Sequence, residues 1–235
     1  SVTNRTVTIT GTGATTINGV IDDGGTATAS ALTKAGAGTL TLSGANTYRG
    51  TTTVSAGTLV LAGGAAIADT GAVNLSTAGA TLQLNANETI GDLTGVASTT
   101  LALGSNTLST GDASSTTHAG TVTGTGSIVK LGTGTFTLSG NNGFSGGLTI
   151  REGTVSGTTS ANAFGTGTIT IGDTSGSANA TLNGGLAGTF TNAITVAAGS
   201  SGSLRISNSA ASIFSGAVTL ANNQTLAPTL TNALT

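Results

Sequence analysis

One short motif in the sequence could belong to a serine hydrolase. Residues 143–147 read Gly-Phe-Ser-Gly-Gly and fit the pattern G-x-S-x-G, in which the central serine is a nucleophile on a strand-to-helix turn. A serine nucleophile needs a base, and His118 is the only histidine of the chain. However, the residues after Ser145 have the spacing of a strand. We therefore interpret Ser145 as a turn residue, and His118, within a polar stretch, as a surface or turn residue.

Acidic residues could act in pairs on glycosides or pectin. The chain has eight, and most stand beside Gly or Thr, which is typical of turns: Asp22, Asp23, Asp69, Glu88, Asp92, Asp112, Glu152 and Asp173. Asp22 and Asp23 precede two glycines and are the one candidate for a calcium ion, but the calcium-binding pattern G-G-x-G-x-D is absent. We read Lys34 and Lys130 as solvated charges at strand ends. We predict no catalytic residue, no cofactor and no metal site, and so no enzyme.

The composition is unusually poor in charge. Charged residues make up 6% of the 235 residues, against about 25% in a typical soluble domain, and the net charge is −2. Six scattered Lys and Arg residues argue against nucleic-acid binding. No apolar run is long enough for a transmembrane helix. With 39 Gly and only 3% aromatic residues, the core must be thin and built from small and β-branched side chains.

Alternation of polar and apolar residues predicts short, half-buried strands. It occurs in five stretches, at residues 6–10, 39–43, 81–85, 135–139 and 167–171. Gly and Asn stand between them, and we expect both to provide the positive φ angles of sharp turns. The chain is therefore predicted to be all β.

A repeat of about 24 residues selects among the all-β folds. Four aromatic residues are each followed six positions later by an aliphatic one: Tyr48/Val54, Phe144/Ile150, Phe190/Val196 and Phe214/Leu220. Filling the gaps gives the ladder Val54, Leu75, Leu101, Val122, Ile150, Ile171, Val196 and Leu220. Such a unit is one turn of a solenoid. We predict a single parallel β-helix over residues 1–235 with roughly ten turns, and keep a β-sandwich and a propeller as alternatives.

A longer repeat is superimposed on the short one. Residues 34–59 align with residues 130–155 without a gap, at an offset of 96. The two copies, at 32–61 and 128–155, resemble the autotransporter-associated β-strand repeat, also called the passenger-associated transport repeat; we expect degenerate turns over 160–235. The resemblance implies a right-handed parallel β-helix in the stalk of a secreted bacterial surface protein, where such repeats are thought to help the passenger fold as it crosses the outer membrane.

Three functions remain open from the sequence. The first is an extracellular stalk that supports surface display, adhesion or self-association. The second is a fibre subunit that stacks end to end. The third is a flat threonine array that binds ice, suggested by T-x-T at residues 6–8 and 26–28. We place it last, because the second copy has Gly-Leu-Thr at 147–149 where the first has three threonines at 51–53.

Overall fold

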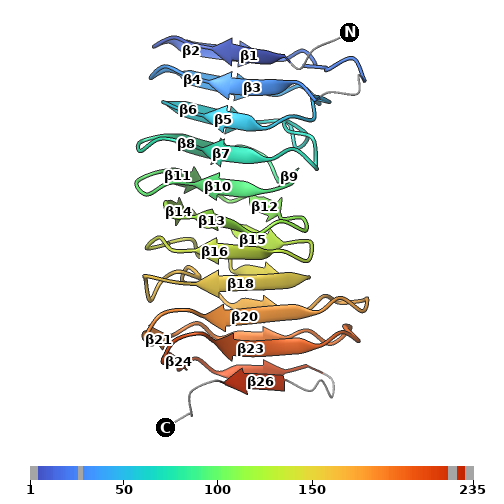
Figure 1. Ribbon diagram of the computed structural model, residues 1–235, viewed down its shortest axis with the longest axis vertical. Helices are drawn as coiled ribbons and strands as arrows, with labels where there is room; N and C mark the ends of the chain where they lie inside the picture. Colours follow the sequence, from blue (N-terminus) through green and yellow to red (C-terminus); the bar gives the residue numbers. More distant parts are fainter. Residues whose placement is uncertain (1–4, 26–28, 222–226, 231–235) are drawn as a thin grey trace.

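The chain winds into a parallel β-solenoid of about ten turns (Figure 1). The computed structural model describes residues 5–25, 29–221 and 227–230. Every strand pair among them is parallel, and each strand pairs with its equivalents in the turns before and after. This excludes the β-sandwich alternative, whose sheets would be antiparallel. The described residues include no helix of the length and hydropathy that crossing a membrane requires.

Three long sheets form the faces of the rod. Sheet A contains β1 (Thr6–Ile9), β3 (Ala31–Lys34), β5 (Thr52–Val54), β7 (Val73–Leu75), β10 (Leu93–Gly95), β13 (Thr116–His118), β16 (Thr135–Leu138), β18 (Gly153–Gly157), β20 (Ala180–Gly184), β23 (Leu204–Asn208) and β26 (Ala227–Leu230). Sheet B contains β2 (Ala14–Ile17), β4 (Thr39–Leu42), β6 (Thr58–Leu61), β8 (Thr81–Leu84), β11 (Thr100–Ala102) and β14 (Thr121–Thr123). Sheet C contains β9 (Glu88–Ile90), β12 (Thr107–Thr110), β15 (Ser127–Lys130), β17 (Leu148–Ile150), β19 (Ile169–Ile171), β22 (Ile194–Val196) and β25 (Val218–Leu220). A fourth, short pair joins β21 (Gly188–Phe190) and β24 (Ser212–Phe214).

The core is a narrow stack of aliphatic rows. Because side chains alternate between the two sides of a strand, every second residue faces inward. One inner row of sheet B consists of Leu40, Leu59, Leu82, Leu101 and Val122, all fully buried. All five stretches predicted from alternation are strands, namely β1, β4, β8, β16 and β19.

The ladder predicted from the sequence is correct in pieces. Val54 pairs with Leu75 in sheet A, and Leu101 pairs with Val122 in sheet B. Ile150, Ile171, Val196 and Leu220 form one row of sheet C. The ladder is wrong where it joins these pieces, because it passes from one face of the rod to the next. Most turns advance by 19 to 23 residues, slightly fewer than the predicted 24.

Glycine, but not asparagine, provides the left-handed corners. Gly57 has φ 64°, and a Cβ there would lie 2.3 Å from the carbonyl oxygen of Gly38 in the preceding turn. The described non-glycine residues with positive φ are Ser98 and Thr159. The prediction that asparagines adopt this conformation is therefore wrong; they have another role, described below.

Candidate functional site

The residues of the hydrolase-like motif do not form a catalytic pair. Ser145 is exposed, and its backbone N–H donates to the carbonyl of Gly124 at 3.1 Å, as expected for a turn residue of the solenoid. His118 does not lie on the surface as predicted. It is in β13, fully buried, and points into the core. Both imidazole nitrogens lack a hydrogen-bond partner among the described residues, so the histidine has no link to a nucleophile there.

His118 fits inside because its neighbour in sheet A has no side chain. Gly95 is its register partner, and a Cβ on Gly95 would lie 2.3 Å from the imidazole Nδ1. Loss of water around the ring lowers the pKa of His118 to about 4, with a smaller opposite effect from the Thr121 backbone. At neutral pH the ring is therefore uncharged, as its apolar surroundings require.

The two lysines are also buried, which corrects their interpretation as solvated charges. Lys34 and Lys130 are 2% and 1% exposed. The Lys34 Nζ donates to the carbonyls of Ala35, Gly36 and Ala56 at 3.3, 2.8 and 3.1 Å. Each ammonium bends over the turn that follows its own strand. There it donates hydrogen bonds to carbonyls of turn residues, which lie outside the sheets.

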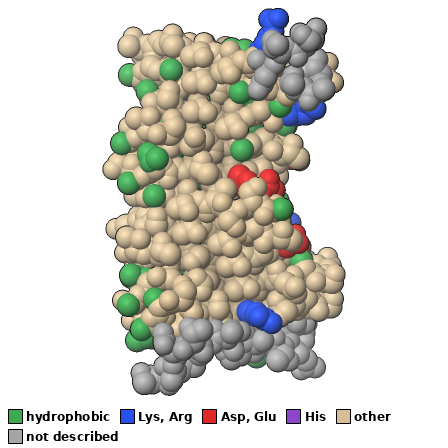
Figure 2. Space-filling view, viewed as in Figure 1, with side chains coloured by type: hydrophobic (Ala, Val, Ile, Leu, Met, Phe, Trp, Pro, Cys, Tyr) green, Lys and Arg blue, Asp and Glu red, His purple; other side chains and the backbone are tan. Residues whose placement is uncertain are grey.

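The second ammonium repeats this arrangement with acidic neighbours. Lys130 Nζ donates to the carbonyl of Leu131 and, at 2.7 Å, to that of Gly132. Burial lowers the pKa of Lys130, and the carboxylates of Glu152, Asp92 and Asp112 partly offset this effect. Figure 2 shows the few acidic side chains near the right-hand edge of the rod, the edge at which the strands of sheet A begin.

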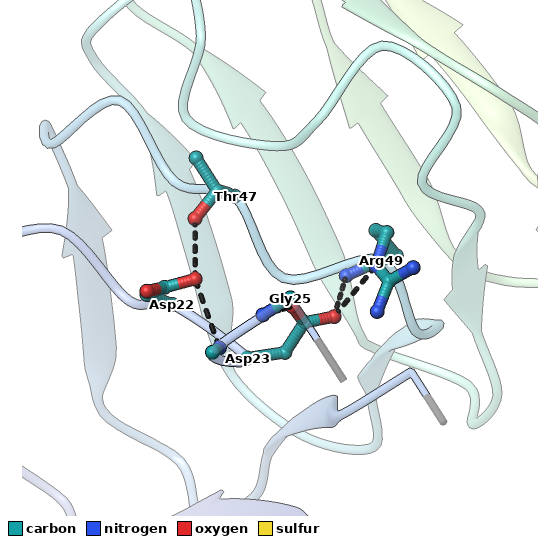
Figure 3. Close-up of polar contacts among 6 residues, drawn as sticks. Asp22, Asp23, Gly25, Thr47 and Arg49 are labelled. Carbon is teal, nitrogen blue, oxygen red and sulfur yellow. Dashed lines mark hydrogen bonds and ion pairs between the residues drawn. The ribbon is translucent and has the colours of Figure 1, made fainter. Parts of the chain in front are cut away.

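The carboxylates of Asp22 and Asp23 tie two turns together (Figure 3). Asp22 Oδ1 accepts from the Thr47 hydroxyl at 2.9 Å, and Asp23 Oδ2 accepts from Arg49 Nε at 2.9 Å. The hydrogen bond and charge of Arg49 hold the pKa of Asp23 below its usual value. The pair lies at a turn, as predicted, and a guanidinium stands where a calcium ion would need free carboxylate oxygens.

Glu88 is the acidic residue that departs most from the prediction. It begins β9, points inward and is 2% exposed, rather than lying at a turn. Its Oε1 accepts from the Ile67 N–H at 2.7 Å, and burial raises its pKa. The remaining acidic residues lie between strands as predicted, and among them Asp173 pairs with Arg151 at 3.7 Å.

A buried asparagine in each repeat copy links three consecutive turns. Asn142 Oδ1 accepts from the Val122 N–H of the preceding turn at 2.8 Å, and its Nδ2 donates to the Ala163 carbonyl of the following turn at 2.6 Å. Asn46 does the same with Ile21 N–H at 2.7 Å and Ala66 carbonyl at 2.8 Å. One amide side chain thus replaces the two hydrogen bonds that a strand would make at this point.

These asparagines lie in segments without strands, and each copy places its segment on a different face. In the first copy, residues 43–51 connect β4 of sheet B to β5 of sheet A and occupy the position of sheet C. In the second, residues 139–147 connect β16 of sheet A to β17 of sheet C and occupy the position of sheet B. Sheet C accordingly begins at β9, after the first copy, and sheet B ends at β14, before the second.

The rotation between the copies follows from the offset of 96 residues. Four turns from Lys34 lead through Val54, Leu75 and Gly95 to His118, all in sheet A. Lys130 lies twelve residues farther on, in sheet C. The long repeat is therefore not a whole number of turns, and it moves the strandless face around the rod.

The sequence contains one indication that the Lys and Asn residues of the two copies are buried, although their residue types suggest the surface. Lys and Asn are usually exposed, so a single occurrence of either indicates surface. Lys34/Lys130 and Asn46/Asn142 recur at the same offset within aligned segments, although their partners are mostly backbone groups. A polar residue that recurs at a fixed position of the repeat therefore indicates a side chain with a structural role inside the rod.

The comparisons with known proteins agree with this geometry. A family model described as the passenger-associated-transport-repeat matches residues 32–61 and 128–156, the two segments that carry the buried Lys and Asn. No curated protein matches the chain as a relative. The matched repeat is the one that marks the β-helical passengers of autotransporters. The protein is thus a parallel β-solenoid that contains two copies of the passenger-associated transport repeat, one on each side of its middle turns.

Proposed function

We propose that the chain is a stalk segment in the secreted passenger of an autotransporter-like bacterial surface protein. Its task is mechanical: it holds other parts of the protein away from the cell surface, and its sides are available for adhesion or self-association. The observation that carries this proposal is the continuity of sheet A, which runs through eleven strands without interruption. At about 4.8 Å per strand, this sheet makes a rod about 50 Å long.

The chemistry of the polar residues supports a mechanical role. The buried Lys, Asn and Glu residues are bound to backbone groups of the rod itself, and Asp23 is bound to Arg49. Each of these contacts joins adjacent turns or closes a corner. Turnover assays with pectin and with other glycans should therefore show no activity.

The repeat copies would assist folding during export. Asn142 and Asn46 each need only the preceding and following turns to complete their hydrogen bonds. Contacts of such short sequence separation can form as soon as three turns have emerged, before the rest of the rod is available. We infer that each copy stabilises a newly formed piece of solenoid at the place where one of its three sheets is missing.

Surface display of turn deletions tests the stalk. Deleting residues 107–126 removes one whole turn, and Ser127 then takes the place of Thr107 in sheet C, because the two are register partners. Deleting residues 107–116 removes fewer residues but breaks the register. With the chain fused between a membrane anchor and an outer epitope, we expect flow cytometry to detect the epitope for the full chain and the whole-turn deletion only.

The same experiment can contradict the proposal. Equal display of both deletions would show that an intact rod is not needed, and failure of the full chain to display the epitope would exclude a stalk. Electron microscopy of the purified chain gives an independent reading. Single short rods agree with a stalk segment, whereas long filaments would favour the fibre subunit.

A further inference from the structure

Sheet B carries a row of threonines that the long repeat does not reveal. Thr39, Thr58, Thr81, Thr100 and Thr121 are register partners in five consecutive strands, β4, β6, β8, β11 and β14. They point outward, because the residue that follows each of them belongs to the buried aliphatic row. Neighbouring hydroxyls along the row are therefore separated by about 4.8 Å, the distance between strands.

The surroundings of this row are free of charge. The second outward position of the same strands holds Thr41, Val60, Gln83, Ala102 and Thr123. The residues next to the ends of these five strands, at residues 35–38, 43–47, 55–57, 62–66, 76–80, 85–87, 96–99, 103–106, 119–120 and 124–126, include no Asp, Glu, Lys, Arg or His. Arg49 and Asp69 lie farther along the connections that leave β4 and β6. An ordinary protein surface of this size would carry several charged residues.

The hydroxyls of the row are held in place yet remain available. All five threonines are half-buried, so the strands above and below restrict their side chains. Within the part of the chain that the structure describes, the hydroxyls of Thr39, Thr58, Thr81 and Thr100 make no hydrogen bond. Sheet A differs in this respect: Thr94 donates to Asn74 at 3.0 Å, and Ser207 donates to Asn183 at 3.1 Å.

We propose that sheet B, from β4 to β14, is an ice-binding face. A rigid, uncharged array of hydroxyl and methyl groups with one constant spacing is complementary to a solid whose hydrogen-bonding groups also repeat. The repeat of water molecules along one axis of hexagonal ice is close to the spacing between strands. Charged groups, which organise their own hydration water, are absent from this face, and the array needs no rearrangement to bind.

The sequence analysis placed ice binding last because three threonines of the first repeat copy are not kept in the second, but the structure shows that these residues do not lie on sheet B. Thr52 and Thr53 belong to sheet A, and their counterparts Leu148 and Thr149 belong to sheet C, so the change between the copies leaves sheet B intact. The T-x-T pairs of sheet B are Thr39/Thr41 and Thr121/Thr123, at the two ends of the row. Of the two T-x-T runs noted in the sequence, 26–28 lies outside the described residues and 6–8 is in sheet A.

Thermal hysteresis of the purified chain tests the proposal. We expect a freezing point measurably below the melting point, with ice crystals shaped by the protein. The variant Thr81→Lys/Thr100→Lys puts two charges at the centre of the row and should lose most of this gap. The matched control is Thr149→Lys/Thr170→Lys, on adjacent outward positions of sheet C, and it should keep the gap.

A second pair of variants guards against loss of folding. Thr100→Tyr keeps a residue that favours strands but disrupts the flat face, and Thr170→Tyr is its control on sheet C. Circular dichroism should show the same thermal transition for both. Absence of hysteresis in the unmodified chain, or equal loss in the sheet B and sheet C variants, would overturn the proposal. The ice face is independent of the stalk, since surface display of the chain does not require it.

Discussion

The hydroxyl oxygens of Tyr48 and Thr52 lie 2.7 Å apart inside the rod, and neither residue is more than 1% exposed. Burial raises the pKa of Tyr48 to about 12, with the Thr52 hydrogen bond acting in the opposite direction. At the same positions the second copy has Phe144 and Leu148, both also buried. One copy thus contains a complete polar pair and the other a complete apolar pair, and neither leaves a hydroxyl alone.

This relationship predicts strong coupling between the two positions. Tyr48→Phe leaves the buried Thr52 hydroxyl without its partner and should lower the free energy of unfolding by about 1–2 kcal/mol. Adding Thr52→Val removes that hydroxyl, so the double variant should be more stable than the sum of the single changes by about 1 kcal/mol. Urea denaturation of the four proteins measures the coupling, and additive effects would contradict it.

The second copy provides the reverse experiment. Phe144→Tyr introduces a hydroxyl opposite Leu148, which cannot bind it, and should destabilise the protein by about 1–3 kcal/mol. Phe144→Tyr combined with Leu148→Thr recreates the pair of the first copy and should recover part of that loss. No recovery in thermal denaturation would mean that the two strandless segments are not equivalent in packing.

The asparagine links predict a larger effect. Asn142→Leu keeps the approximate volume but leaves the Val122 N–H and the Ala163 carbonyl unpaired in a buried place, which should cost about 2–5 kcal/mol. Asn141, its exposed neighbour, is the matched control, and Asn141→Leu should change the stability by about 0.5 kcal/mol. Similar transitions for the two variants in chemical denaturation would exclude the proposed role of Asn142.

The sequence was sufficient to predict the fold, because the alternation of polar and apolar residues that marks a strand lies within a few neighbouring residues. The runs that became β4, β8, β16 and β19 could be read directly, since each inward residue is apolar and each outward residue is polar. The face on which a run lies depends instead on the summed lengths of all preceding connections. For that reason the ladder through Leu75 and Leu101 joined two sheets that the structure keeps apart.

The buried polar residues could not be placed by such local patterns. Lys34 occupies an inward position of β3, but the carbonyls that stabilise it come from two corners of the chain. His118 is accommodated only because Gly95, 23 residues earlier, lacks a side chain. Both facts concern partners in adjacent turns, and a single sequence without the register does not show which residues are adjacent.

The burial of Lys130 predicts that its substitution lowers the stability more than substitution of the neighbouring, more exposed cation Arg151. Lys130→Met removes the ammonium that binds the carbonyls of Leu131 and Gly132, and should cost about 1–3 kcal/mol. Arg151 lies one turn farther on and is half exposed, with a long ion pair to Asp173, so Arg151→Met should change the stability by less than about 1 kcal/mol. Thermal denaturation at neutral pH compares the two, and an equal loss would show that Lys130 acts only as a surface charge.

His118 predicts a specific dependence of stability on pH. Its pKa is about 4 in the folded chain, against an ordinary histidine value of 6.5, so between these values the unfolded chain binds more protons than the folded one. The free energy of unfolding should therefore fall as the pH decreases from 6.5 to 4, by about 3 kcal/mol for this residue alone. Glu88, whose pKa is raised by burial, has the opposite effect on stability above the ordinary glutamate pKa of 4.5, because the folded chain keeps this proton to a higher pH than the unfolded chain. The informative quantity is thus the difference between the unmodified chain and His118→Leu, measured by urea denaturation at several pH values. That difference should change steadily between pH 6.5 and 4 and be constant above 7, and a difference independent of pH would show that the imidazole reaches solvent in the folded rod.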